Sequence, residues 1–300
     1  MAARSPHPLD RRTVARHFDR AAPSYDAAAV LQREVARRML ERLDYIKVAP
    51  GRVLDLGCGT GSDLAPLAAR FPDARVIGLA RSATLLASAR EEGSWLRRLA
   101  RLGRPRNERP VCVADAAALP LADRSVSLLW SNFLLHWFAE PQAVLAEMHR
   151  VLEVGGLLMF ACLGPDTLRE LRDAFAQASP GVHVHRFIDM HDLGDMLVGA
   201  GFGDPVMDME TITLTYESVR ALALDLRANG ATLAADVRAR GLMGRHTWAR
   251  MVDAYETLRS ADRLPATFEV VYGHAWRPHP RVTDDGRAII RFQPRGGASL

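Results

Sequence analysis

Between residues 53 and 163, short apolar runs alternate with segments whose apolar residues recur at helical spacing. These runs predict strands at 53–56, 76–79, 111–114, 126–131 and 157–163. Helices are predicted at 64–71, 82–90 and 141–152, the last of them stopped by Gly155 and Gly156. Strands that are apolar at nearly every position are buried on both faces, as in a parallel sheet covered by helices. The pattern therefore predicts an α/β, doubly wound, Rossmann-like sheet that binds its ligand at the carboxyl ends of the strands.

The flanking segments follow a different rhythm. Residues 10–44 are predicted to be helical, with a break at Pro23. Beyond residue 163 the pattern predicts helices at 166–176 and 192–200 and strands at 207–216 and 268–276. The alternation changes phase near Thr211, which predicts a β-bulge there. We expect four parts: a helical cap at 1–50, a cofactor-binding core at 51–163, the rest of the sheet with a helical lid (about 217–262) at 164–277, and a loose tail at 278–300.

Composition is that of an ordinary globular protein, since 48% of the 300 residues are hydrophobic and 25% are charged. A run of about 18 apolar residues and a signal-peptide core are both missing, which predicts a cytoplasmic protein. Cys58, Cys112 and Cys162 lie far apart in apolar segments, so we expect buried, reduced thiols and no metal site.

The net charge is +4, and arginines crowd the stretch 90–109. This stretch either binds an acidic partner or forms a solvated helix and loop. Trp95 is its only aromatic residue, which argues against a surface on which nucleic-acid bases stack.

A glycine-rich turn after the first strand carries the clearest chemical signal. Asp55, Gly57, Gly59 and Gly61 form the pattern D-x-G-x-G-x-G, and glycines let the backbone approach a ligand closely. A dinucleotide fingerprint fits less well, because Ser62 stands where it needs a third glycine or alanine. The pattern resembles motif I of class I S-adenosylmethionine-dependent methyltransferases. The resemblance implies that S-adenosylmethionine is the cofactor and that Asp55 holds its amino group.

The same resemblance covers the ends of three further strands. It implies that Asp115, with Ala116, binds the adenine and that Asn132 lies near the sulfonium. The second strand departs from the pattern, because Ala80 stands where an acid normally binds the ribose hydroxyls. Losing such a charged hydrogen bond costs roughly 1.5–3 kcal/mol. Arg81 is therefore expected to stack on the adenine or to donate to the ribose instead.

More specific segments surround this core. They are F-x-x-A-A-x-x-Y-D at 18–26, W-S-N at 130–132 with L-H-W at 135–137, H-R-F at 185–187 and N-G-A-T at 229–232. Together they resemble the malonyl-carrier-protein O-methyltransferases of biotin synthesis, which form a methyl ester on a malonyl thioester held by an acidic acyl carrier protein. The resemblance implies a seven-stranded sheet with one antiparallel strand. It also implies catalytic or substrate-binding roles for Tyr25, His136 and Arg186, with Arg186 as a buried clamp for the carboxylate.

Three other functions stay open from the sequence, and methylation of another small molecule on the same fold is the first of them. The segments 164–172, 135–137 and 265–268 also resemble the arginine hydroxylases that assist assembly of respiratory complex I, which share this fold. A cofactor-binding protein without catalysis is the third class, and Ala80 is the residue that favours it.

Overall fold

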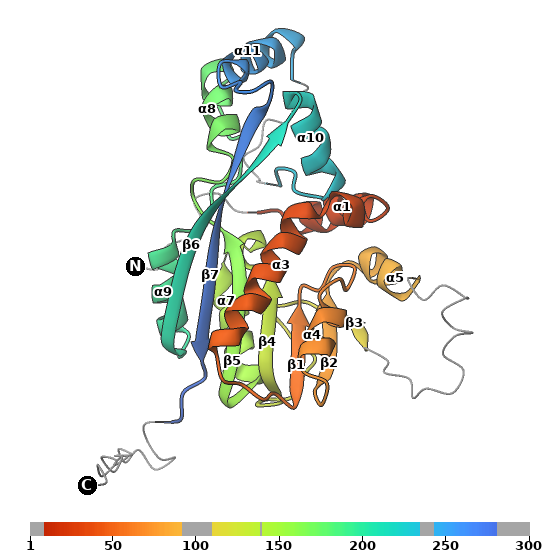
Figure 1. The fold of residues 1–300 in the computed structure, drawn as a ribbon, viewed down its shortest axis with the longest axis vertical. Coiled ribbons are helices and arrows are strands. Elements are labelled where there is room, and N and C mark those ends of the chain that lie inside the picture. The colour runs from red at the N-terminus through yellow and green to blue at the C-terminus, as the bar shows by residue number, and fades with distance from the viewer. Residues whose placement is uncertain (1–8, 92–109, 139, 235–242, 281–300) are drawn as a thin grey trace.

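The computed structural model describes residues 9–91, 110–138, 140–234 and 243–280, and within them one seven-stranded sheet has the order β3-β2-β1-β4-β5-β7-β6 (Figure 1). Its strands are β1 (Arg52–Leu56), β2 (Arg75–Ala80), β3 (Val111–Val113), β4 (Val126–Asn132), β5 (Leu152–Leu163), β6 (Gly203–Tyr216) and β7 (Leu264–Trp276). Strand β7 runs antiparallel to both of its neighbours, and the other pairs are parallel. The predicted doubly wound α/β sheet with one antiparallel strand is confirmed.

Helices cover both faces of this sheet (Figure 1). In chain order they are α1 (Arg11–Ala21), α2 (Tyr25–Ala28), α3 (Val30–Arg42), α4 (Leu64–Arg70), α5 (Ala83–Glu91), α7 (Pro141–Val151), α8 (Arg169–Ala178), α9 (Met190–Gly199), α10 (Val219–Ala228) and α11 (Arg245–Glu256). Successive strand residues point to opposite faces. Leu128 therefore packs with α3 and α4, whereas Leu129 packs with α7 and α9. Both residues are fully buried, which explains why the central strands are apolar at nearly every position.

Strands β6 and β7 extend beyond the rest of the sheet and carry a separate helical group. Helices α8, α10 and α11 gather around this extension, above the carboxyl ends of the parallel strands (Figure 1). Helix α1 lies between the group and the sheet and contacts both α10 and α5. The space in which a ligand is expected is therefore bordered by three elements: the strand ends, the N-terminal helices and this helical group.

The prediction that Gly155 and Gly156 stop a helix is wrong. Helix α7 already ends at Val151, and Leu152 begins β5. The reason is Arg277, whose Nη1 donates to the carbonyl oxygens of residues 149, 150 and 152 at 2.8, 2.9 and 2.5 Å. Cationic donors favour the carbonyl end of a helix, so a side chain from the far end of the chain stabilises this terminus.

The predicted bulge at Thr211 is also wrong. Pairing of β6 with β7 is continuous from Val206 to Tyr216, and the register shifts between Gly203 and Val206 instead. The alternation of apolar and polar residues changes phase because the two halves of β6 are covered on opposite faces. Met207 packs with α9 on one face, while Leu214 packs on the opposite face with the core around α3.

Other expectations are resolved in part. Cys58 and Cys162 are buried as expected, but Cys112 is exposed, because β3 is an edge strand. Most of the arginine-rich stretch (92–109) and most of the tail (281–300) lie outside the described residues. Among the helices that the structure does describe, none combines the length and apolar character needed to span a membrane.

We expect Gly273→Ala to destabilise the fold by about 1–3 kcal/mol, because a methyl group at this position would collide with the buried ring of Phe160. Gly194→Ala is the matched control. It lies inside α9 with its nearest new contact at 3.8 Å from Met207, so it should stabilise by about 0.4–1 kcal/mol. Denaturant unfolding measures both variants, and equal effects of the two substitutions would contradict the packing described here.

Candidate functional site

The turn after β1 has the backbone shape that its glycines predict. Gly57, Gly59 and Gly61 have φ angles of 89°, 55° and 81°, all in the left-handed region that favours glycine. A side chain on Gly57 would contact Leu134 at 3.1 Å. The turn therefore needs glycine for its conformation and, at Gly57, also for space.

Asp55 is a buried acid with one unpartnered oxygen among the described residues. It is 1% exposed, and its Oδ2 atom has no hydrogen-bond partner among the described residues. Burial and the neighbouring charge of Asp63 raise the pKa of Asp55 well above its usual range. A buried acceptor without a partner is costly, and a bound cation would remove that cost.

Asp63 is a second acid of the site, and the sequence did not reveal it. It stands at the N-cap of α4, which made it an ordinary helix-start residue, yet its side chain forms no cap hydrogen bond. It instead accepts a hydrogen bond from Trp130 Nε1 at 3.0 Å, and burial raises its pKa. Two acids held close together in a buried site favour a cationic ligand. The ammonium and sulfonium groups of S-adenosylmethionine fit this requirement.

The N-terminal helices close over the glycine turn. Tyr25 lies above Gly59, since a Cβ built on that glycine would be 3.7 Å from the tyrosine ring. The Asp26 carboxylate accepts a hydrogen bond from the Thr60 hydroxyl at 2.5 Å. Burial raises the pKa of Tyr25, and the charges of Asp63, Asp26 and Asp55 add to the shift. Tyr25 therefore keeps its proton and remains a hydrogen-bond donor at neutral pH.

Polar atoms also face this space from the end of β4. Asn132 donates from Nδ2 to the carbonyl oxygen of Gln32 at 3.0 Å. The side-chain oxygens of Asn132 and Gln32 are buried and have no partner among the described residues. The structure thus brings Tyr25, Asp55, the glycine turn and Asn132 to one location.

The remaining predicted cofactor residues lie at the ends of β2 and β3. Asp115 accepts a hydrogen bond from the backbone N–H of Ala117 at 3.0 Å, a local turn contact, and forms an ion pair with Arg11. Ala116 is buried, whereas Arg81 is exposed. An adenine amino group at Asp115 would therefore compete with Arg11.

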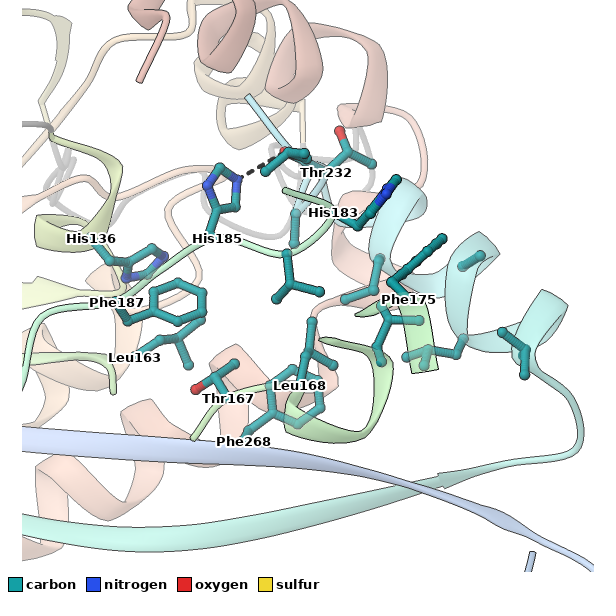
Figure 2. A pocket seen from close by; sticks show the side chains of 18 of the residues that line it. His136, Leu163, Thr167, Leu168, Phe175, His183, His185, Phe187, Thr232 and Phe268 are labelled. Atoms are coloured by element: carbon teal, nitrogen blue, oxygen red, sulfur yellow. Dashed lines mark hydrogen bonds between the residues drawn. The ribbon is translucent and has the colours of Figure 1, made fainter. Parts of the chain in front are cut away.

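An apolar cavity of about 190 Å³ lies between the strand ends and the helical group (Figure 2). Histidine and aromatic rings border one end of it, among them His136, His185 and Phe187 (Figure 2). A smaller cavity of about 50 Å³, lined by Tyr25 and Gln32, shares its wall with the larger one at residues 136, 137, 163, 226, 231 and 268. The two cavities are therefore adjacent, the smaller one beside Tyr25 and the larger one within the helical group.

His136 stands where the two cavities meet. Its Nδ1 atom is buried and has no partner among the described residues. Burial, with a smaller contribution from His185, lowers the pKa of His136 to about 3. The ring is therefore neutral at physiological pH, with one nitrogen as donor and the other as acceptor.

The expectation that Arg186 is buried is wrong. Its side chain is exposed and lines neither cavity, whereas the adjacent residues His185 and Phe187 both line the larger one. Among the described residues, neither cavity has an arginine or lysine in its wall.

Three segments far apart in the sequence are tied together beside the larger cavity. His17 Nδ1 and the Thr232 hydroxyl are 2.7 Å apart, and His185 Nε2 lies 3.3 Å from the Thr232 carbonyl oxygen. The resemblance pointed to residues 185–187 and 229–232 but not to His17. His17 reaches Thr232 because α1 packs beside the helical group, and the sequence around His17 gives no indication of this contact.

Comparison with known proteins agrees with this geometry. Residues 54–160 match the family described as "Methyltransferase domain". A malonyl-[acyl-carrier protein] O-methyltransferase of Laribacter hongkongensis is 54% identical over 96% of this chain and 98% of its own length. The enzyme of the same name from Gallionella capsiferriformans is 52% identical over 94% of this chain and 96% of its own.

Solved structures share the fold at much lower identity. An S-adenosylmethionine-dependent methyltransferase of Thermotoga maritima, 17% identical, has a TM-score of 0.51 and covers 88% of this chain and 99% of its own. The [4+2]-cyclase SpnF, 21% identical, has a TM-score of 0.50 and covers 82% and 81%. Because a cyclase shares the architecture, the fold by itself does not decide the reaction.

We expect Asp55→Asn to weaken binding of S-adenosylmethionine by about 10- to 100-fold, the usual effect of losing a hydrogen bond to a charged group. The raised pKa of Asp55 also affects stability. The protonated carboxyl stabilises the ligand-free protein fully below the usual carboxyl pKa of about 4. This stabilisation is lost as the pH rises through the raised pKa of Asp55 in the folded protein. The variant should therefore be more stable than the wild type at neutral pH, with a flatter pH profile.

Calorimetric titration and denaturant unfolding between pH 4 and 8 measure the two effects. The exposed Asp173→Asn on α8 is the control and should change neither. Unchanged cofactor binding in Asp55→Asn would contradict the role of the buried carboxylate.

Proposed function

The chain belongs to the malonyl-[acyl-carrier protein] O-methyltransferases, and from this premise we propose that it methylates the free carboxylate of a malonyl thioester on acyl carrier protein, an early step of biotin synthesis. Two adjacent cavities carry the proposal. The smaller one is lined by Tyr25, which lies above the glycine turn, and the larger, apolar one lies in the helical group. A malonyl thioester has a matching division, with a polar carboxylate at one end and a long arm behind it.

S-adenosylmethionine is the cofactor, and when bound it supplies an electrophilic methyl group on a cationic sulfur. We assign its binding to Asp55, Gly57, Gly59, Gly61, Asp115, Ala116 and Asn132, with Arg81 at the edge of the site. Asp55 and Asp63 supply negative charge opposite its cationic groups. Because the glycines of the turn carry no side chain, the cofactor can approach the backbone closely there.

The protein's task is to position the substrate rather than to remove a proton. A carboxylate is already ionised at neutral pH, so the reaction needs no general base. The protein must hold the carboxylate oxygen in line with the methyl group, at roughly 3 Å, and exclude water. The rings of Phe18, Tyr25 and Trp137 pack around the smaller cavity and serve this exclusion.

We assign the carboxylate contact to neutral His136 and to Tyr25. His136 has a buried ring nitrogen without a partner, and Tyr25 keeps its hydroxyl proton because its pKa is raised by burial and by nearby acids. The clamp by Arg186 stays a prediction that requires the segment 183–187 to turn inward, since its side chain is exposed here. The malonyl carrier partner and a cytoplasmic location belong to the same proposal.

The test is the intact mass of malonylated acyl carrier protein after incubation with the protein and S-adenosylmethionine. We expect a gain of one methyl group that alkaline hydrolysis removes, because the product is an ester. Acetylated carrier protein is the control and should gain nothing, since it lacks the free carboxylate. No gain on the malonyl substrate, with cofactor binding intact, would reject the proposal and favour the hydroxylase class.

Two variants separate the carboxylate contacts in the same assay. His136→Phe should lower kcat/KM for the malonyl substrate about 10- to 100-fold and leave the Kd for the cofactor unchanged, because it removes one hydrogen bond to a charged group. Arg186→Ala should change kcat/KM less than His136→Phe does. The reverse order would show that Arg186 turns inward to hold the carboxylate.

A further inference from the structure

The larger cavity reaches the protein surface between α10 and α11. Ala223 and Trp248 line it from these two helices and are both exposed, with Trp248 at 37%. Leu222 and Leu226 line it as well and are buried. The smaller cavity, lined by Tyr25, lies on the other side of the shared wall, so an arm that entered here would point toward the glycine turn.

Basic side chains surround the opening. Arg220 and Arg227 lie about one turn to either side of Ala223 on α10, and Arg245 lies one turn before Trp248 on α11. All three are exposed, and none has a carboxylate partner within the part of the chain that the structure describes. By contrast, Arg150 on the body of the protein pairs with both Glu147 and Asp123.

Apolar side chains accompany these arginines. Leu224 on α10 is 55% exposed, and Met243, just before α11, is 41% exposed. Of the acids nearby, Asp225 is engaged by the Tyr216 hydroxyl at 2.7 Å, and Asp253 lies about two turns beyond Arg245. Exposed apolar residues beside exposed arginines are the usual composition of a protein-binding surface.

We propose that the α10–α11 surface, formed by Arg220, Leu224, Arg227, Arg245 and Trp248, docks the acidic carrier protein. The carrier's malonyl-bearing arm then enters the cavity directly beneath. Exposed arginines attract an acidic partner and orient it before contact. This inference rests on the proposed function and adds to it the place at which the partner binds.

The test is the triple substitution Arg220→Glu, Arg227→Glu, Arg245→Glu, measured with two substrates. We expect KM for malonylated carrier protein to rise about tenfold or more, because rim charges govern encounter with a charged partner. The kinetics with malonyl-pantetheine, which carries no protein, should not change. Arg75→Glu is the matched control, since it is exposed at the opposite end of the sheet and should affect neither substrate.

The two substrates distinguish an error in the docking surface from an error in the proposed methyltransferase function. If the wild type methylates neither substrate, the proposed function is wrong. If it methylates both and the triple variant keeps the wild-type KM for the carrier, only the docking surface is wrong. A loss caused instead by Arg97→Glu, Arg98→Glu, Arg101→Glu would move docking to the arginine-rich stretch and would also overturn the proposal.

A separate observation concerns the end of β2. Dinucleotide-binding sheets place an acid there to bind the ribose hydroxyls, and this chain has Ala80. Asp19 of α1 lies beside that position, because its Oδ1 accepts a hydrogen bond from the Ser82 hydroxyl at 2.6 Å. Ser82 in turn accepts from the backbone N–H of Leu85 at 3.1 Å, so the contact is held at the start of α5.

Helix α1 reaches this edge of the sheet at more than one point. Arg11, two turns before Asp19, pairs with Asp115 beyond the end of β3. After α1 the chain continues to Tyr25 above Gly59. We infer that Asp19 supplies from α1 the ribose-binding carboxylate that β2 lacks, with its second oxygen free of hydrogen bonds to the described residues.

Calorimetric binding of S-adenosylhomocysteine and its 2′-deoxy analogue tests this role without any turnover. Asp19→Asn should raise the Kd for S-adenosylhomocysteine about tenfold and should bind the two ligands equally, because the ribose contact is gone. Adding Ala80→Asp to that variant should restore both affinity and discrimination. The exposed Asp73→Asn is the control and should behave as the wild type.

Thermal unfolding of each variant separates loss of the contact from loss of the fold. The inference is overturned if Asp19→Asn keeps the wild-type preference for the ribose hydroxyl. It is also overturned if the double variant, folded as the wild type, does not regain that preference.

Discussion

A buried acid, one oxygen of which has no partner in the described part of the chain, is the constraint on which the rest of this site depends. Asp55 lies in a central strand of the sheet, 1% exposed, with a second, half-buried acid, Asp63, close by. Removing a charged group from water costs several kcal/mol unless a partner offsets it. The surroundings therefore lower the stability of the ligand-free protein and favour a cationic ligand. The glycine turn is what allows that ligand to approach the backbone.

The remaining walls follow from the need to keep water out of this location. The N-terminal helices contribute Tyr25 above the turn and Asp26 to Thr60, while the helical group on β6 and β7 covers the substrate side. Because each wall comes from a different part of the chain, the site exists only when the sheet and both sets of helices are assembled. Neutral rings at its centre, such as His136, suit a reaction whose nucleophile is already ionised.

The sequence predicted the sheet well where burial is symmetrical. Strands β1, β4 and β5 are covered on both faces, so continuous apolar runs identify them. Prediction failed where a contact from elsewhere decides the local structure. Arg277 contacts the end of α7, which stops before the glycines. In β6, a change in the covered face gives the sequence pattern of a bulge, although the pairing is continuous. In both cases the packing partner lies outside the segment whose sequence was used for the prediction.

What the sequence determined by itself is the chemistry carried by contiguous residues. The turn from Asp55 to Gly61 needs only its own backbone angles, so a pattern of glycines is enough to identify it. The direction of single side chains was decided by the tertiary structure. Asp63 stands at the N-cap of α4, but its side chain lies in the site, and the Arg186 side chain is exposed. Asp19 lies beside Ser82. Each depends on packing between elements distant in the chain, where local spacing carries no information.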